Sequence, residues 1–379
     1  MRVMVTGQVG VGKKGYLEAV QQLAGQEGQA VGLYHVGDRM YAEAPDVKVP
    51  HILDLPLSRL NALRRAVFKD IISESVGQEH IMVNTHATFR WRHGLFSAFD
   101  FDQVQKLQID GLICLLDNIE VVHHRLHGEH TVDATFKDLM VWREEEIMAT
   151  ELLAQALGCS ARFYILSRGR HVETHETCWR LISKPKMRRV YLSFPMTHVV
   201  DMPEILAEID AFRAQLAKQF IAFDPGDVDE KILLDSAISA AKDGKDFISA
   251  PAGAESGGQD RIRVAVKQVL DIAGDIDGQI YARDFKMVDQ SDMIVSLVPQ
   301  LPGGTPGLSS GVERELHHAF EHGKEVYVIW KPERHPSPFV TKTATKVFAS
   351  TDEALAYFAQ SGMFGRVKVG GAIKGISFA

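Results

Sequence analysis

A short glycine-rich run near the start of the chain constrains the fold more than any other feature of the sequence. It reads G-Q-V-G-V-G-K over residues 7–13, after the apolar segment RVMVT and before a helix-like stretch. In such a strand–loop–helix, glycines let backbone N–H groups turn towards an anion, and the helix N-terminus and a lysine add positive potential. The pattern predicts a phosphate-binding loop containing Gly7, Gly10, Gly12 and Lys13. The alternative is a tight glycine turn with an exposed lysine.

The first half of the chain alternates strand-like and helix-like segments. The strand-like runs are RVMVTG, AVGLYHV, HIMVNTH, GLICLLD and ARFYILS. Helical patterns occur at residues 57–75, 119–126 and 136–157. Alternating strands and helices with apolar strands are typical of a parallel sheet that is covered on both faces.

The second half repeats this α/β style after a basic, proline-containing stretch at residues 183–188. We place a domain boundary there, which predicts one domain over residues 1–185 and another over 186–379. Helices are predicted at residues 202–219, 262–273, 312–322 and 352–358, and strands in RVYLS, IAFDP, DMIVSLV and EVYVIW. The Ala-, Gly- and Ser-rich residues 249–260 are predicted to form a mobile surface loop.

The composition of the chain limits which kinds of macromolecule or membrane it is expected to bind. The 379 residues include 42 Lys and Arg against 49 Asp and Glu, a net charge of −7 with no long run of one sign. This argues against a nucleic-acid polymer as partner, although a local anion pocket remains compatible with it. No apolar stretch approaches membrane-spanning length, the start lacks a signal-peptide pattern, and three cysteines make no disulfide framework. We therefore expect a cytoplasmic protein with no membrane partner.

Four passages of the first half resemble the archaeal-type adenylate kinases and related nucleoside monophosphate kinases. They are VTGQVGVGKK, YHVGDRMYAEA, HIMVNTHATF and HHRLHGEHTVDATFKDLMVWREEE. The resemblance implies ATP or another nucleotide at the P-loop, with Arg125 and Arg143 matching lid arginines. Lys14 stands where that family has a Ser or Thr that ligates Mg²⁺, and Asn84 stands where it has an aspartate. Mg²⁺ binding and kinase activity are therefore left open.

A second constellation lies in the C-terminal half. A strand-end Tyr191 is followed by Asp284 in a D-x₇-D spacing, and by the pattern S-x-G-x-x-x-E made of Ser309, Gly311 and Glu315. An open α/β sheet binds its ligand outside the carboxyl ends of its strands, where these segments are predicted to lie. Paired carboxyl groups are what the cleavage of a glycosidic bond needs. The alternative for the glutamate alone is a solvated helix-face carboxylate.

These C-terminal motifs resemble the nucleoside 2-deoxyribosyltransferase superfamily, and most closely its 2'-deoxynucleoside 5'-monophosphate N-glycosidases. The resemblance implies a Rossmann-like α/β domain in which Glu315 is the nucleophile, Asp284 is the acid/base and Tyr191 orients the nucleophile. It also implies a 5'-phosphate site at Ser309 and Gly311, which Ser337 extends across a dimer interface. A homo-oligomer is expected on the same ground.

Histidines gather at His123, His124, His127 and His130, but no Cys or Asp completes a metal-ligand set, and no metal is predicted. The chain is predicted to hydrolyse the N-glycosidic bond of a (deoxy)nucleoside 5'-monophosphate, with a nucleotide-binding, kinase-like first domain. Three alternatives stay open: base exchange between deoxynucleosides, a bifunctional kinase and glycosidase, and a nucleotide-sensing regulatory protein without turnover.

Overall fold

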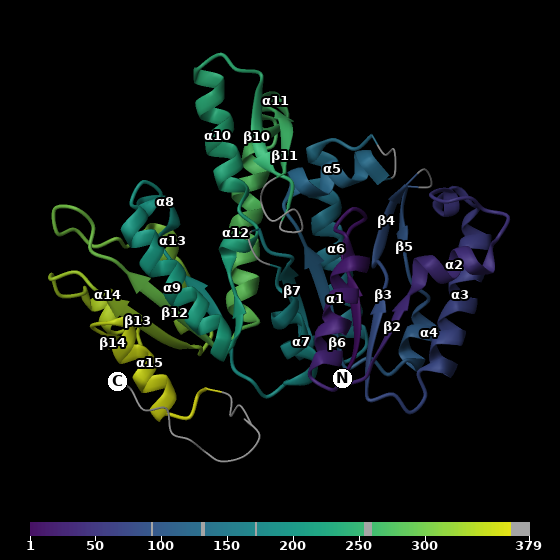
Figure 1. The fold of residues 1–379 in the computed structure, drawn as a ribbon, viewed down its shortest axis with the longest axis horizontal. Coiled ribbons are helices and arrows are strands. Elements are labelled where there is room, and N and C mark those ends of the chain that lie inside the picture. Colours follow the sequence, from purple (N-terminus) through teal and green to yellow (C-terminus); the bar gives the residue numbers. More distant parts are fainter. Residues whose placement is uncertain (92–93, 130–132, 171–172, 254–259, 365–379) are drawn as a thin grey trace. The chain divides into compact units, whose positions relative to one another are not determined.

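The computed structural model describes residues 1–379 except 92–93, 130–132, 171–172, 254–259 and 365–379 (Figure 1). Contacts divide the chain into two compact units. The P-loop unit comprises Met1–Pro185 and Phe223–Gln290, and the C-terminal unit comprises Lys186–Ala222 and Ser291–Ala379. The sequence predicted a single boundary at residue 185, whereas the contact pattern also groups Phe223–Gln290 with the first unit.

The sheet of the P-loop unit has the strand order β2-β3-β1-β6-β7. All four neighbouring pairs are parallel, so the predicted parallel sheet is confirmed. β1 lies in the middle, and the chain first builds the sheet on one side of it and then on the other. The loop after β1 therefore lies where α/β sheets bind ligands. The strands are β1 (Arg2–Thr6), β2 (Val31–His35), β3 (His80–Asn84), β6 (Gly111–Leu116) and β7 (Phe163–Ser167).

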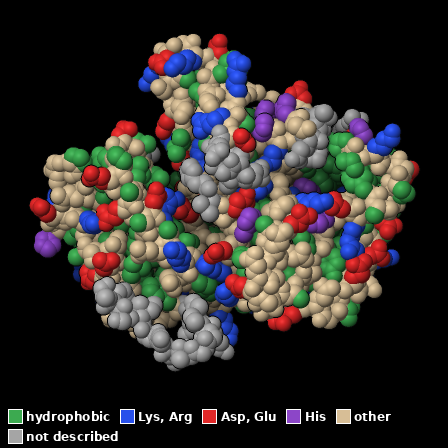
Figure 2. Space-filling model, in the orientation of Figure 1, with side chains coloured by type: hydrophobic (Ala, Val, Ile, Leu, Met, Phe, Trp, Pro, Cys, Tyr) green, Lys and Arg blue, Asp and Glu red, His purple; other side chains and the backbone are tan. Residues whose placement is uncertain are grey.

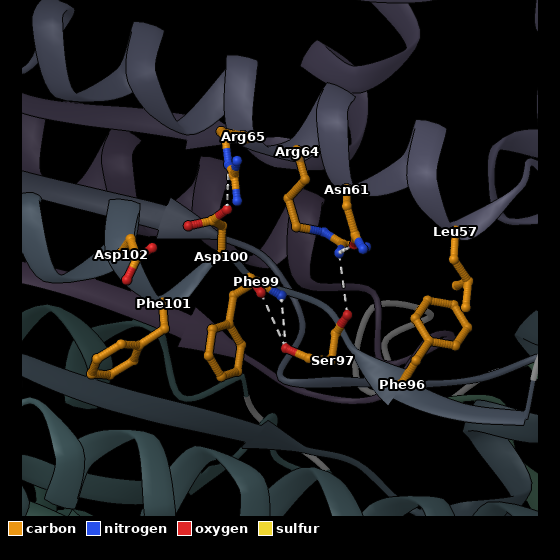
Figure 3. A pocket seen from close by; sticks show the side chains of 10 residues that line it. All are labelled: Leu57, Asn61, Arg64, Arg65, Phe96, Ser97, Phe99, Asp100, Phe101 and Asp102. Carbon is orange, nitrogen blue, oxygen red and sulfur yellow. Dashed lines mark hydrogen bonds and ion pairs between the residues drawn. The ribbon is translucent and has the colours of Figure 1, made fainter.

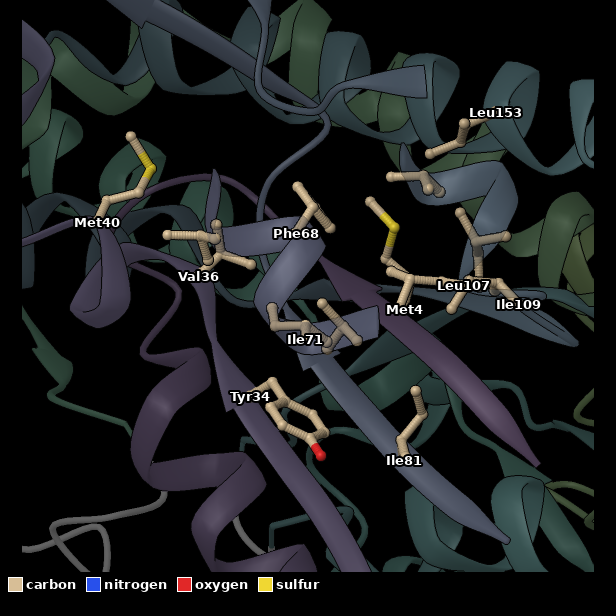
Figure 4. Packing of buried hydrophobic residues seen from close by; sticks show 14 of the residues in the cluster. Met4, Tyr34, Val36, Met40, Phe68, Ile71, Ile81, Leu107, Ile109 and Leu153 are labelled. Carbon is tan, nitrogen blue, oxygen red and sulfur yellow. The ribbon is translucent and has the colours of Figure 1, made fainter. Parts of the chain in front are cut away.

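Helices cover both faces of this sheet. On one face, Met4 and Ile81 pack with Phe68 and Ile71 of α3 and Leu153 of α6 (Figure 4). Val3 and Val5, on either side of Met4 in β1, point to the opposite face of the sheet. They are buried as well, so helices must also cover that face. The helices are α1 (Lys13–Gln26), α2 (Val36–Glu43), α3 (Leu57–Glu74), α4 (Phe101–Lys106), α5 (Ile119–Glu129), α6 (Phe136–Ala156) and α7 (His175–Ser183). A hairpin of β4 (Thr88–Trp91) and β5 (Gly94–Ser97) follows β3.

The segment Phe223–Gln290 contains α10 (Glu230–Lys242), the antiparallel pair β10 (Phe247–Pro251) and β11 (Arg261–Ala265), α11 (Val266–Leu270) and α12 (Ala273–Asp289). The helix predicted at residues 262–273 is wrong in its first part, which is β11. Ile262 and Val264 are buried and alternate with exposed arginines, a period of two that fits a strand. Part of the predicted loop at 249–260 belongs to β10, and residues 254–259 lie outside the described residues.

The C-terminal unit is built on a five-stranded sheet with the order β14-β13-β12-β8-β9. β8 pairs with β12, β12 with β13 and β13 with β14 in parallel register. The order corresponds to 2-1-3-4-5 along the chain, a doubly wound arrangement whose switch point lies between β8 and β12. The strands are β8 (Arg189–Ser193), β9 (Ile221–Phe223), β12 (Met293–Val298), β13 (Glu325–Trp330) and β14 (Lys346–Phe348). The helices are α8 (Met196–Val199), α9 (Pro203–Gln219), α13 (Ser310–Glu321), α14 (Pro338–Thr341) and α15 (Thr351–Gln360).

Within the described part of the chain, no helix combines the length and the apolar character needed to cross a membrane. Figure 2 shows Lys and Arg side chains interspersed with Asp and Glu on the face in view. This mixture of charges agrees with the small net charge, and the face in view carries no extended patch of positive or negative potential.

Candidate functional sites

The P-loop has the backbone that its glycines predict. Gly7, Gly10 and Gly12 have φ values of 138°, 86° and 77°, a region that side chains rarely adopt. A Cβ on Gly7 would lie 2.5 Å from the carbonyl oxygen of Leu115, so the loop also needs glycine for space. Gly12 precedes α1, and no side chain caps that helix end. The first N–H groups of α1 thus remain available to an anion.

Lys13 is held inside the loop by buried groups. Its Nζ donates to the carbonyl oxygen of Gly7 at 2.6 Å and lies 3.2 Å from Nδ1 of His86. Burial lowers the pKa of Lys13 to about 8, and the negative charge of Glu146 partly offsets this shift. The ammonium is therefore mostly protonated at neutral pH and close to its titration.

Glu146, on α6, connects the P-loop to the start of β4. Its carboxylate accepts hydrogen bonds from the backbone N–H groups of Gly7 (2.9 Å), Ala87 (2.7 Å) and Thr88 (2.8 Å), and from the Thr88 hydroxyl (2.8 Å). Glu146 is 1% exposed. The sequence alone indicates no role for Glu146, because nothing in the run REEE distinguishes it from its neighbours.

Two arginines bind the outside of the P-loop backbone. Arg125, on α5, donates to the carbonyl oxygens of Gly10 (3.2 Å) and Val11 (3.1 Å), and to Asp117 at 2.7 Å. Arg168, just after β7, donates to the carbonyl oxygens of Val11 (3.0 Å) and Gly12 (3.3 Å). The predicted P-loop residue Arg125 is thus at the loop, together with an arginine that the sequence analysis missed. The only signal for Arg168 was its place after a strand.

Arg143 is engaged elsewhere. Its Nη1 donates to Oε1 of Glu230 at 2.5 Å, and its Nη2 donates to Gln279 at 2.6 Å. Arg283 contacts the same Glu230 carboxylate at 3.5 Å. Burial alone would raise the pKa of Glu230, but the charges of Arg143 and Arg283 outweigh it and hold the pKa below its usual value. The segment Phe223–Gln290 therefore supplies the partners of an arginine that was predicted to bind nucleotide.

The residues that would hold Mg²⁺ do not fit it in the usual way. Lys14 places an ammonium after the P-loop lysine and pairs with Asp38 at 2.6 Å. Asn84 Nδ2 lies 2.9 Å from His35 Nδ1, so an amide replaces the carboxylate of the related kinases. Lys14 and Asn84 thus offer neither the P-loop hydroxyl nor the strand-end carboxylate that bind the metal in related enzymes.

A cavity of about 360 Å³ adjoins the P-loop. Its lining includes Gly10, Lys13 and Lys14 from the loop, and side chains of α2, α3 and the end of β3. The passage YHVGDRMYAEA, predicted to line an acceptor-nucleotide pocket, contributes part of that lining. A cation-rich end beside an otherwise largely apolar lining suits a phosphorylated ligand.

The C-terminal unit brings Tyr191 and Glu315 together. The Tyr191 hydroxyl donates to Oε1 of Glu315 at 2.8 Å, and the Ser193 hydroxyl donates to Oε2 at 2.6 Å. Tyr191 and Ser193 lie on the same face of β8 and are fully buried, whereas Glu315, on α13, is partly exposed. A carboxylate is thereby fixed by two hydroxyl groups at the carboxyl end of β8, an interior strand of the sheet.

The predicted phosphate-site residues lie at helix starts. Ser309 caps α13, and its hydroxyl oxygen accepts from the N–H of Val312 at 3.2 Å. Gly311 lies in the first turn of α13, four residues before Glu315. Ser337 precedes α14, a helix of four residues, and its side chain makes no capping bond.

Asp284 belongs to the P-loop unit, on α12, while Glu315 belongs to the C-terminal unit. Burial raises the pKa of Asp284 to about 6, the neighbouring Arg283 opposes this shift, and the charges of Asp229 and Asp224 add to it. A carboxyl group with this pKa is about one-tenth protonated at pH 7, and the protonated fraction can act as a general acid.

Of the clustered histidines, His123 and His127 have ring centroids 4.3 Å apart, and burial lowers the pKa of His123 to about 4. His130 lies outside the described residues.

The sheet order and the glycine loop define a P-loop, kinase-like α/β domain in the first part of the chain. Residues 6–143 match a family described as an AAA domain. The chain is also similar to an adenylate kinase of Pyrococcus abyssi (strain GE5 / Orsay), with 28% identity over 179 aligned residues. This match covers 46% of this chain and 86% of the adenylate kinase. A shikimate kinase from Bacteroides thetaiotaomicron matches with a TM-score of 0.29 and 13% identity, over 44% of this chain and 86% of that one.

These similarities are consistent with ATP or another nucleotide at the P-loop. They concern the P-loop unit, and the transferase-like character of the C-terminal unit stays a prediction.

Proposed function

We propose that this chain is a nucleotide-metabolising enzyme whose C-terminal unit hydrolyses the N-glycosidic bond of a (deoxy)nucleoside 5'-monophosphate. Glu315 is the nucleophile in this proposal. The observation that carries it is the pair of short hydrogen bonds from Tyr191 and Ser193 to the two oxygens of the Glu315 carboxylate. Two neutral donors fix the orientation of this carboxylate, one on each oxygen, while its partial exposure leaves it accessible.

The reaction has two steps. The Glu315 oxygen bonds to the anomeric carbon, the carbon–nitrogen bond breaks, and its electron pair leaves with the base, which takes a proton from an acid. Water then hydrolyses the glycosyl ester, which returns the carboxylate and gives the free sugar phosphate. The role of that acid is predicted for Asp284, and its raised pKa favours this role. The 5'-phosphate is proposed to bind at Ser309 and Gly311, where α13 begins, and Ser337 is proposed to extend that site in a homo-oligomer.

The test is release of free base, followed by chromatography, from a panel of ribo- and deoxyribonucleoside monophosphates. Glu315→Gln keeps the size of the side chain but removes the nucleophile, and we expect base release to fall at least 1,000-fold. Glu321→Ala, at an exposed position on the same helix, serves as the matched control and should keep the rate of the wild type. Equal release by wild type and Glu315→Gln would contradict the assignment. Release only with an added acceptor base would favour base exchange.

For the P-loop unit we propose nucleotide binding, which the P-loop geometry and the similarity to an adenylate kinase support. Lys14 and Asn84 stand against an ordinary Mg²⁺-dependent kinase, so binding without phosphoryl transfer is the first expectation. Calorimetric titration with ATP, with Lys13→Ala as the comparison, tests binding. Conversion of ATP to ADP that needs Lys13 and Mg²⁺ would instead favour the bifunctional alternative, and binding with no turnover in either unit would favour the regulatory one.

A further inference from the structure

A buried arginine borders two cavities of the P-loop unit. Arg64, on α3, is 2% exposed and lines both the cavity beside the P-loop and a second one of about 350 Å³. Its Nη1 donates to Oδ1 of Asn61 at 3.0 Å and to the carbonyl oxygen of Ser97 at 3.2 Å (Figure 3). Its Nη2 has no hydrogen-bond acceptor among the residues that the structure describes.

Arg64 differs from the arginine next to it. Arg65 pairs with the Asp100 carboxylate at 2.7 Å, whereas no described carboxylate lies within ion-pair distance of Arg64 (Figure 3). Burial lowers the pKa of Arg64 to about 10, and the charge of Asp100, which is already paired with Arg65, only partly opposes this shift, so the guanidinium is charged at neutral pH. A buried donor without an acceptor is costly, and a buried charge without a partner is more so. An acceptor brought by a ligand would offset that cost.

The larger cavity favours a planar ligand with a phosphate. Lys13 and Lys14 contribute cations to its lining, and Tyr41, Phe89 and Trp91 contribute aromatic rings. The Tyr41 hydroxyl accepts from the N–H of residue 52 at 3.1 Å, and Trp91 Nε1 donates to a carboxylate at 3.0 Å. Because protein groups engage these polar atoms, the two rings offer mainly their apolar surface to a ligand.

The smaller cavity has a different chemistry. Asp100 and Asp102 line it beside Arg64 and Arg65 (Figure 3). Its two carboxylates repel an anionic ligand, and Arg65 is already paired there, whereas the larger cavity has one lining carboxylate, Asp38, which is paired with Lys14. The unpaired donor of Arg64 is therefore better matched to the cavity that begins at the P-loop.

We propose that Arg64 recognises the base of a nucleoside monophosphate in the larger cavity and selects a 6-keto purine, such as guanine, over adenine. Arginine carries only donors. Guanine presents two acceptors, O6 and N7, on one edge, whereas adenine presents an amino donor beside N7. This inference rests on the proposed nucleotide binding by the P-loop unit, and it adds which base that site prefers.

The test measures binding of GMP, IMP and AMP to the full chain that carries Glu315→Ala, so that the C-terminal unit does not consume the ligand. Trp91 reports on the cavity, and the fluorescence change it gives should be absent in Trp91→Phe. We expect GMP and IMP, which share O6 and N7, to bind about 10- to 100-fold more tightly than AMP. Removal of N7, in 7-deaza-GMP, should weaken binding without any change to the protein.

Arg64→Gln should lower the affinity for GMP at least tenfold and raise that for AMP, because a glutamine amide pairs with N6 and N7 of adenine. Arg65→Gln, one position away and exposed, is the matched control and should leave the ratio unchanged. Equal Trp91-reported affinities for GMP and AMP in the parent chain would overturn the role of Arg64 while nucleotide binding stands. No Trp91 signal with any nucleotide, together with no binding of ATP, would instead overturn the proposed function of this unit.

Discussion

Two glutamates, one in each unit, show how differently this chain uses a carboxylate. Glu146 is fully enclosed and accepts hydrogen bonds from three backbone N–H groups and one hydroxyl. Glu315 is partly exposed and accepts from the side chains of Tyr191 and Ser193. Backbone N–H groups cannot move away unless the chain itself shifts, so Glu146 stabilises the conformation of the segments that it binds. Hydroxyl groups can rotate, so the second carboxylate is positioned and remains able to react.

The largest effect is expected from Glu146→Ala. Removal of its carboxylate leaves four buried donors without an acceptor, and we expect the free energy of unfolding to fall by about 3–5 kcal/mol. Glu315→Ala should cost less, because only two side-chain hydroxyls lose an acceptor and a hydroxyl can rotate towards another one. Urea denaturation of both variants measures the difference. Equal losses of stability would break the comparison.

The ion pair between Glu230 and Arg143 extends the comparison to buried charges. Glu230→Gln leaves Arg143 and Arg283 without their anion, and we expect a loss of about 3 kcal/mol in the free energy of unfolding. Glu151→Gln, which removes a half-exposed partner of Lys286, is the matched control and should change it by less than about 1 kcal/mol. A Glu230→Gln variant as stable as this control would mean that the segment Phe223–Gln290 is not anchored by these charges.

The lowered pKa of Lys13 gives the P-loop unit a dependence on pH. The ammonium deprotonates as the pH rises through about 8, so the affinity for ATP should fall about tenfold between pH 7 and pH 9. Folding stability moves the other way. Between about pH 8 and 10.5 the unfolded chain binds more protons than the folded one, so this residue makes stability rise with pH. Titration calorimetry across this range tests the binding, and Lys13→Met should bind weakly with no such slope.

The smallest effect is expected from Tyr191→Phe. This change removes one of the two hydroxyl donors to Glu315 and keeps the ring, so base release should fall about three- to tenfold with little change in stability. Ser193→Ala should have an effect of similar size, and the double variant should lose more than either. An unchanged rate in all three variants would show that these hydrogen bonds do not position the nucleophile.

Local patterns predicted much of the fold. The five strands of the P-loop sheet lie within the strand-like runs of the sequence, and α3 (Leu57–Glu74) and α6 (Phe136–Ala156) end within a residue of the predicted helices. The helix predicted at residues 262–273 failed because Arg261–Ala265 pairs with Phe247–Pro251, a partner that no local window contains. The hairpin of β4 and β5 was missed for the same kind of reason.

The candidate sites likewise contain residues that local sequence identified and residues whose partners lie far away in the chain. Spacing identified the P-loop, and the resemblance to the deoxyribosyltransferase superfamily implied that Tyr191 orients Glu315. The resemblance to the adenylate kinases assigned Arg143 to a nucleotide, whereas its partners are Glu230 and Gln279, 87 and 136 positions further along the chain. Nothing in the sequence marked Arg64 or Glu146, because their character comes from burial.

By itself, the sequence determined two α/β sheets, a glycine loop that no other residue type could form, and a glutamate placed one turn into a helix. These features depend on short-range geometry, which the order of residues specifies directly. The tertiary structure alone decided which charges are compensated: Glu146 by backbone donors, Arg143 by Glu230, and Arg64 only in part. A charge removed from water must find its partner in space, and that partner is set by how distant segments pack.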